Sequence, residues 1–217
     1  MSENITPSAE LDLDAWLETG ERTTHEVKIF ARMDLVAEVE ALEAQLVPVE
    51  TVPEGEEALG GNDNPNAELE ARINDLWDRI AASRRVFRVT ALTQQEIDAI
   101  RETVLTECSD EIDKAAAFGR AEAKKTCKRM EVTVPADINA LVRVGVKEFT
   151  DKVINRETTL RMIAKATTLQ NGSEYFPLTL DQTRTIYEKL GEAQVGLLAD
   201  AARKANHEVP QVTVPKS

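Results

Sequence analysis

Side chains that could do chemistry are few in this sequence and lie far apart. The histidines, His25 and His207, are near opposite ends of the chain, and the cysteines, Cys108 and Cys127, are 19 positions apart. Zinc and similar metals are bound by such ligands at short spacings, so the sequence predicts neither a metal nor another cofactor. A nucleophile and base pair of Cys108 and His25 has no local support. Two reduced, structural thiols are the favoured interpretation.

Acid–base chemistry would need paired carboxylates, and one acidic segment offers them. It contains Glu107, Asp110, Glu111 and Asp113. Carboxylates are also favourable near the N-terminus of a helix, where they face the positive end of its dipole, so a solvated helix face explains them without catalysis. The sequence has no G-x-x-x-x-G-K-[S/T] phosphate loop, no G-x-G-x-x-G turn and no G-x-S-x-G elbow. These observations predict a protein that is not an enzyme.

The charge of the chain is concentrated in its first third. The net charge is −13, and residues 1–70 hold 18 Asp and Glu against 3 Lys and Arg. Such a surface repels nucleic acid and anionic membranes. Arg84, Arg85 and Arg88 beside Phe87 have the residue types of a base-stacking surface, but the flanking segment is acidic. The sequence therefore predicts neither a nucleic-acid nor a membrane partner, and it has no signal-type or membrane-spanning run, so a cytoplasmic location is expected.

Two stripes of apolar side chains recur with the spacing of one face of an α-helix. The first is Leu35, Val39, Leu42 and Leu46, and the second is Leu69, Ile73, Leu76 and Ile80. The segment between them, residues 47–66, is rich in Pro, Gly and carboxylates and is predicted to be a loop. Two matching stripes joined by a loop predict an antiparallel helical hairpin formed by residues 34–47 and 67–83. Its base is expected to be closed by short strands at 27–30 and 86–89.

The second half of the chain is predicted to be a helical body. Capping boxes at 93–96 and 179–182 mark two helix starts, and a further helix is expected over 110–130. A short strand is possible at 131–135, and 136–169 reads as one long helix or two consecutive ones. The last helix is expected to bury one stripe, composed of Ile186, Leu190, Ala193, Leu197 and Ala201.

The predicted fold class is therefore mainly α: a helical hairpin arm clasped by a two- or three-stranded β element and joined to a C-terminal helical body. The expected divisions are a flexible segment at 1–24, the arm at 25–92, the body at 93–207 and a flexible tail at 208–217.

Five apolar or aromatic residues are candidates for binding a partner protein. Trp16 and Leu17 belong to an acidic, apolar turn that could be either a partner-binding peptide or a segment docked on the core. Val36 and Trp77 sit beside the hairpin stripes and could either line a groove or widen the seam. Phe87 in the second short strand completes the set.

The arrangement of the first half of the chain resembles that of a family of bacteriophage proteins. The segments that carry the resemblance are VKIFARMDLVAE at 27–38, the Pro- and Gly-containing break, EARINDLWDRI at 70–80 and VFRVTALT at 86–93. Together they are similar to tail assembly chaperones of tailed phages that infect actinobacteria, over roughly residues 12–105.

Membership of that family would imply a non-enzymatic protein of the host cytoplasm. It would bind the long helical tape-measure protein during tail morphogenesis, and could also associate with other tail proteins or with copies of itself. The alternative is a structural or scaffold protein of the virion that uses the helical hairpin for assembly. Neither reading involves a cofactor, a nucleic acid or a membrane.

Overall fold

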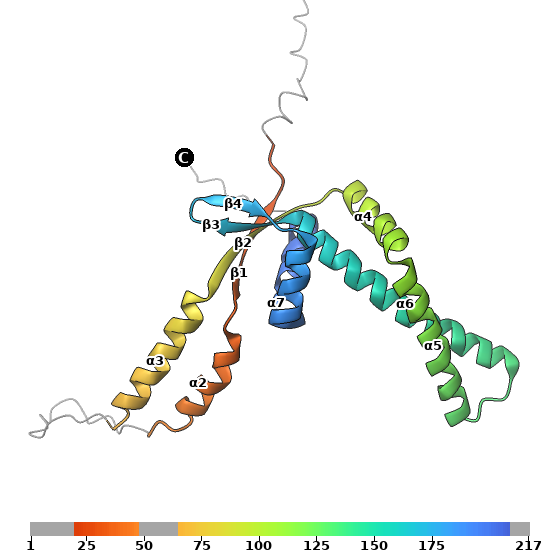
Figure 1. Cartoon of the computed structure of the whole chain (residues 1–217), viewed down its shortest axis with the longest axis horizontal. Coiled ribbons are helices and arrows are strands. Elements are labelled where there is room, and N and C mark those ends of the chain that lie inside the picture. The colour runs from red at the N-terminus through yellow and green to blue at the C-terminus, as the bar shows by residue number, and fades with distance from the viewer. Residues whose placement is uncertain (1–19, 48–64, 209–217) are drawn as a thin grey trace, which may run out of the picture.

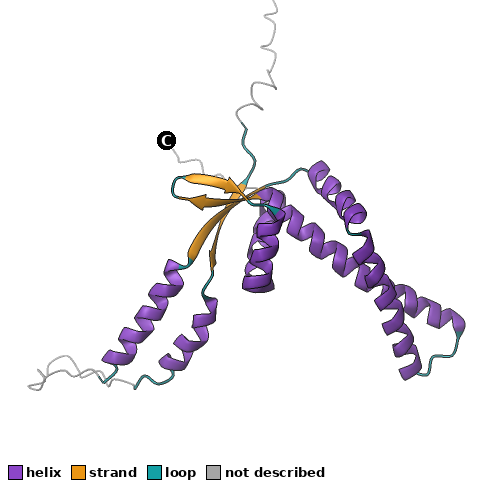
Figure 2. Ribbon diagram, in the orientation of Figure 1, coloured by secondary structure: helices purple, strands orange, loops and turns teal. Residues whose placement is uncertain are grey.

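A computed structural model describes residues 20–47 and 65–208 of the 217-residue chain. It is mainly helical with one small antiparallel sheet, which confirms the predicted class. The sheet lies between two groups of helices, which extend from it in different directions (Figures 1 and 2). Two of the candidate residues, Trp16 and Leu17, lie outside the described residues, as does most of the predicted 47–66 loop.

The sheet has four strands rather than the two or three expected. They are β1 (Thr24–Phe30), β2 (Arg84–Thr90), β3 (Thr167–Asn171) and β4 (Glu174–Pro177), in the order β1-β2-β3-β4. β1 and β2 pair antiparallel along their whole length, with Val27 opposite Phe87. Only three residue pairs join β2 to β3, where Phe87 lies opposite Leu169.

The segments that leave β1 and enter β2 form a pair of helices, which we call the α2–α3 arm (residues 33–47 and 65–82). It contains a 3-10 turn (Met33–Leu35), α2 (Val36–Glu43) and α3 (Ala67–Ala82). The buried apolar side chains of this arm are those of the two predicted stripes: Leu35, Val39 and Leu42 on one side, Ile73, Leu76 and Ile80 on the other, with Leu46 and Leu69 partly buried beside them.

Helix α2 is shorter than the predicted 34–47 element, because residues 33–35 form a 3-10 turn and the chain after Glu43 continues in tighter turns, with hydrogen bonds from Gln45 N to Leu42 O and from Leu46 N to Glu43 O. The end of the arm is held by a side chain instead. Asn66 is only 3% exposed, and its amide both accepts a hydrogen bond from Val47 N at 2.9 Å and donates one to Val47 O at 2.8 Å. A single asparagine thus joins the chain on either side of the 48–64 segment.

The second arm, called the α5–α6 arm, follows α4 (Gln94–Glu107), which starts with the predicted Thr93 capping box. It consists of α5 (Ser109–Arg129) and α6 (Pro135–Ala166). The two helices cross so closely that a Cβ atom added at Gly119 would lie 2.6 Å from Gly145 O. Ala116, Gly119, Ala123 and Cys127 are the buried residues of α5. Glycine is therefore required at this crossing, because any side chain would separate the helices.

Two predictions for the segments around α6 are wrong. Residues 131–135 form no strand, and the predicted helix through residue 169 ends at Ala166. The chain then forms the β3–β4 hairpin, with Asn171 opposite Glu174 across a turn in which Gly172 has φ +65°. The Asn171-Gly172 pair, read as a helix end, is the hairpin turn that supplies the extra strands.

Helix α7 (Leu180–His207) begins at the second predicted capping box but is broken at Gly191, where φ is 80° and ψ is 174°. The break changes which side chains face inward. Beyond the break the predicted stripe is only partly right: Ala193 is exposed and Leu197 is 44% exposed, whereas Ala201 is buried. Val195 and Leu198, which lie outside the predicted stripe, are buried. The buried residues of α7 are Thr183, Val195, Leu198, Ala201, Ala202 and Ala205.

One hydrophobic core joins the sheet to α6 and α7. It includes Ile29, Phe87, Val89, Ile163 and Leu198, each 5% exposed or less. This core contains residues from both sides of the boundary predicted between residues 92 and 93.

The chain segment after β2 lies beside both ends of the described chain. Thr23 O accepts a hydrogen bond from Ala91 N at 2.9 Å, and Asn206 Oδ1 accepts one from Leu92 N at 2.7 Å. The start of β1 and the end of α7 are thereby fixed at adjacent positions.

Candidate partner-binding groove

The described candidate residues for partner binding lie in different environments. Phe87 is 5% exposed and belongs to the core, so its side chain is not available to a partner. Val36 is half-buried against the hydrophobic cluster of the α2–α3 arm, which fits the seam-widening interpretation. Trp77 is 44% exposed and remains a surface candidate.

The side chains considered for chemistry do not assemble into a reactive site. Cys108 and Cys127 are free and buried. The Sγ atom of Cys108 lies 3.9 Å from Arg161 Nη2, whereas His25 Nε2 is buried without a hydrogen-bond partner. Within residues 20–47 and 65–208, no group of three His, Cys, Asp or Glu side chains could hold a metal ion.

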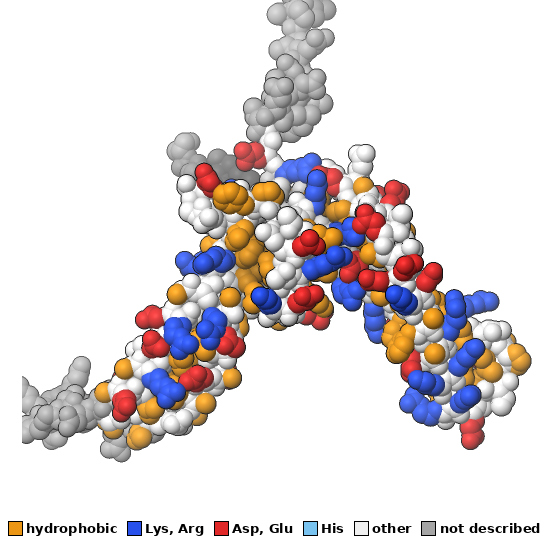
Figure 3. Space-filling view, viewed as in Figure 1, with side chains coloured by type: hydrophobic (Ala, Val, Ile, Leu, Met, Phe, Trp, Pro, Cys, Tyr) orange, Lys and Arg blue, Asp and Glu red, His pale blue; other side chains and the backbone are white. Residues whose placement is uncertain are grey.

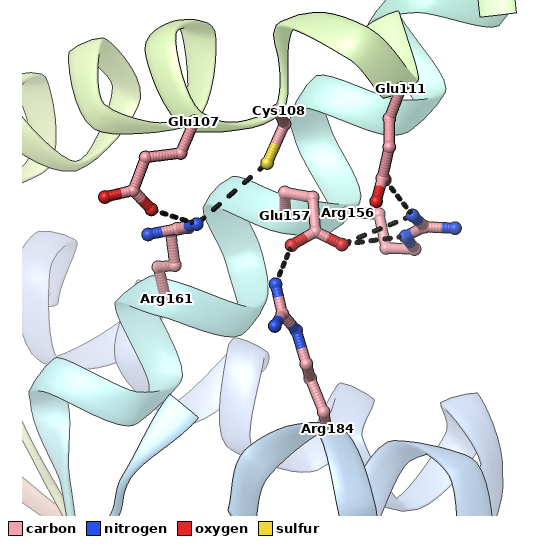
Figure 4. Close-up of polar contacts among 7 residues, drawn as sticks. All are labelled: Glu107, Cys108, Glu111, Arg156, Glu157, Arg161 and Arg184. Atoms are coloured by element: carbon pink, nitrogen blue, oxygen red, sulfur yellow. Dashed lines mark hydrogen bonds and ion pairs between the residues drawn. The ribbon is translucent and has the colours of Figure 1, made fainter. Parts of the chain in front are cut away.

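The carboxylates of the α4–α5 junction serve a different purpose, as Figure 4 shows. Glu107 pairs with Arg161 at 2.8 Å, and Glu111 pairs with Arg156 at 3.4 Å. Both arginines lie on α6. The carboxylates that could have been a catalytic pair therefore fasten the junction of α4 and α5 to the middle of α6.

A buried carboxylate, Glu157 of α6, is the centre of this network. Its side chain is 6% exposed and accepts a hydrogen bond from Arg184 of α7 at 2.8 Å, with Arg156 at 3.2 Å on its other oxygen. Burial alone would raise the pKa of Glu157, but the hydrogen bond and charge of Arg184, together with Arg156, outweigh it and hold the pKa below its ordinary value. Glu157 is therefore a charged link between α6 and α7.

We expect the Glu157→Gln variant to lose about 1–3 kcal/mol of unfolding free energy at pH 7, the usual range for a hydrogen bond to a charged group. Because the folded-state pKa is depressed, the carboxylate stabilises the fold above its unfolded pKa of about 4.3, and this contribution is lost as the pH falls through the folded-state value. The variant should therefore lose less stability on acidification than the parent. Urea unfolding at pH 7, 5 and 3.5 measures both effects.

The control is Glu188→Gln, which alters an exposed carboxylate on α7. Its unfolding free energy should stay within about 0.5 kcal/mol of the parent, as is usual at surface positions. Equal acid dependence in the parent and Glu157→Gln would contradict the assigned role.

A groove of about 680 Å³ runs between α6 and α7 next to this polar network. Its apolar lining is Val153, Leu160, Tyr187, Val195 and Ala199, and its charged residues are Lys152, Arg156 and Glu192. An apolar floor with charges at the edge is the arrangement that receives an amphipathic helix. A second groove, of about 650 Å³, lies between α4 and α6 and includes Ile100, Ala164 and Leu178.

Two glycines of α7 shape the first groove. Gly191 breaks the helix directly before Glu192, and Gly196 lines the groove where an added Cβ atom would meet nothing within 4 Å. Neither the groove nor the Glu157 network was predicted from the sequence. The available signals were the glycine inside an otherwise helical stretch and a Glu on the inward-facing side of α6.

In comparisons with known proteins, no family model, curated protein or solved structure matches the chain. Among the helices that the structure describes, none has the length and apolar character needed to cross a membrane.

Proposed function

We propose that the chain is a non-enzymatic assembly chaperone of a phage tail, which binds an amphipathic helical segment of the tape-measure protein during tail morphogenesis in the host cytoplasm. The observation that carries the proposal is the groove between α6 and α7, with apolar side chains along its floor and charges at its edge. The residues that resemble tail assembly chaperones, at 27–38 and 70–93, indicate which client to test.

The chemistry of the groove fits such a client. A long helix with apolar residues on its surface tends to self-associate, and a chaperone prevents this by covering the apolar face. In the groove, Val153, Val195 and Ala199 would cover apolar side chains, while Lys152 and Glu192 would pair with charges of either sign at the edge.

Gly196 provides a direct test because the space beside it is empty. In Gly196→Leu, the new side chain would occupy the groove without displacing any atom within 4 Å of the added Cβ. We expect co-expressed tape-measure protein to co-purify with the parent and its recovery to fall at least about tenfold with Gly196→Leu, since about 1.4 kcal/mol of lost binding energy is sufficient.

Gly196→Ala is the matched control, since it adds one methyl group and favours the helix by about 1 kcal/mol. It should bind the tape-measure protein almost as the parent does. If the parent fails to recover the tape-measure protein, the client is wrong. If the Gly196→Leu variant recovers as much tape-measure protein as the Gly196→Ala variant does, this groove is not the binding site.

The alternative function is a structural or scaffold protein of the virion. The observation in its favour is the exposed apolar surface of the α5–α6 arm, where Phe118 is 54% and Val144 is 63% exposed. Mass spectrometry of purified particles separates the two functions. A chaperone is expected to be absent from finished particles, whereas abundant peptides of this chain would support the structural role.

A further inference from the structure

The two arms carry opposite charge. The described residues of the α2–α3 arm, 33–47 and 65–82, include eight Asp and Glu but only two Lys and Arg. Both arginines are already paired within the arm, Arg72 with Glu38 at 2.8 Å and Arg79 with Asp75 at 3.8 Å. The remaining carboxylates give this arm an acidic surface.

The far end of the α5–α6 arm is basic. Residues 118–134, which we call the basic tip, hold five Lys and Arg against two Asp and Glu. Lys125 pairs with Glu122 at 2.6 Å, whereas Lys124, Lys128 and Arg129 are exposed and form no ion pair with any described residue. Figure 3 shows the Lys and Arg side chains gathered over this end of the arm. Cations are favourable near the C-terminal end of a helix, which explains why these side chains occur at the end of α5. Their charged groups nevertheless remain exposed to solvent.

Each surface also exposes large apolar side chains. On the basic tip, Phe118 is 54%, Met130 61% and Val134 52% exposed. On the α2–α3 arm, Trp77 is 44% and Val47 56% exposed. Opposite charges around exposed apolar residues are the elements of a protein–protein interface with a steered approach.

The two surfaces cannot meet within one molecule. The α2–α3 arm and the α5–α6 arm extend from the sheet toward opposite sides, with α7 between them (Figure 1). Complementary surfaces that are held apart among the described residues of one chain can meet between two chains, and a second copy of this protein supplies both.

We propose that the basic tip of one copy binds the acidic α2–α3 arm of the next copy, so that the protein associates head to tail. Such a contact is heterologous: each copy uses a different surface toward each neighbour, and the association can continue along a row. This contact is separate from the groove between α6 and α7 and does not depend on the tape-measure protein.

Salt provides the first test. Interactions between exposed charges are screened beyond about 8 Å at physiological ionic strength and over shorter distances in more salt. In sedimentation equilibrium at low salt, the average mass of the parent should rise with concentration to more than two copies, and high salt should lower it. A parent that stays monomeric at every concentration and low salt would overturn the proposal.

Charge-reversed variants provide the decisive test. The tip variant carries Lys124→Glu, Lys128→Glu and Arg129→Glu, and the arm variant carries Glu40→Lys, Glu43→Lys and Asp78→Lys. All six positions are exposed and lack ion pairs with the described residues, so circular dichroism should show both variants folded. Each variant alone should be monomeric. Their equimolar mixture should associate again, because the unaltered arm of one matches the unaltered tip of the other, and the altered tip and altered arm are also opposite in charge at the substituted positions.

The other outcomes are equally clear. Self-association of either variant alone would indicate an interface between like surfaces, and a mixture that stays monomeric would show that the arm and the tip do not bind each other. Either result would overturn the head-to-tail proposal. A charge-preserving control, which carries Lys124→Arg, Lys128→Arg and Arg129→Lys, should associate as the parent does.

Discussion

Replacing Phe87 with alanine is expected to lower the free energy of unfolding by about 3–5 kcal/mol, the cost of truncating a buried aromatic ring. Phe87 is 5% exposed and lies in the core that joins the sheet to α6 and α7. It is also paired with Val27 on one side and Leu169 on the other, so the cavity would fall where three strands meet. Urea unfolding followed by circular dichroism measures the loss.

Trp77→Ala is the matched control, because it removes an even larger aromatic side chain from a position that is 44% exposed. Its unfolding free energy should change by about 0.5 kcal/mol or less. Amide exchange at Val27 to Phe30 should become faster in the Phe87 variant and stay as in the parent in the Trp77 variant. Similar losses in the two variants would mean that Phe87 does not hold the strands together.

The second large effect is expected from Gly119→Ala in the α5–α6 arm. Alanine normally favours a helix over glycine by up to about 1 kcal/mol. Here its Cβ would lie 2.6 Å from Gly145 O, a backbone atom that cannot move without separating the helices. We therefore expect a net loss of about 1–3 kcal/mol, as in other overpacked sites, visible as a lower midpoint in urea.

The matched control is Gly196→Ala, which makes the same substitution at a position without a close contact, since nothing lies within 4 Å of the added Cβ. It should stabilise the protein by about 0.5–1 kcal/mol. If both alanine variants were stabilised, the α5 and α6 backbones would not be in close contact in solution.

Local patterns in the sequence predicted the parts of the fold that depend on one helix or one turn. The 4, 3, 4 spacing from Leu35 and from Leu69 identified the side chains buried in the α2–α3 arm, because a helix places such residues on one face whatever surrounds it. Thr93 and Thr179 identified helix starts for the same reason, as each bonds within its own first turn.

The errors arose where one residue type serves two structures. A glycine with positive φ ends a helix or turns a hairpin equally well, so Gly172 could not distinguish the helix end that was predicted from the β3–β4 turn that exists. A glycine such as Gly191 is compatible with helical geometry as well as with a positive φ, so the apolar spacing alone predicts a continuous helix there. The predicted inward face of α7 is therefore wrong at Ala193 and Leu197, just after the break, and right again at Ala201.

The groove between α6 and α7 and the Glu157 network could not be predicted from the sequence, for a further reason. Glu157 and Arg184 are 27 positions apart and come together only through the packing of α6 on α7. A Glu on an apolar helix face suggests a buried partner, but it does not identify which of the many arginines provides it. Phe87 shows the opposite kind of error. Its aromatic side chain suggested a surface for a partner, but it lies in an inner strand of the sheet and is buried in the core formed with α6 and α7.

The adjacent bonds of Thr23 and Asn206 to the segment after β2 have a practical consequence for protein engineering. The chain before residue 20 and the chain after residue 208 start from neighbouring points at the sheet. An affinity tag or fluorescent protein joined directly at residue 20 or residue 208 would therefore start beside the sheet and away from both arms (Figure 1). The same proximity makes the chain suited to circular permutation, with new ends opened in the exposed turn at Gly172.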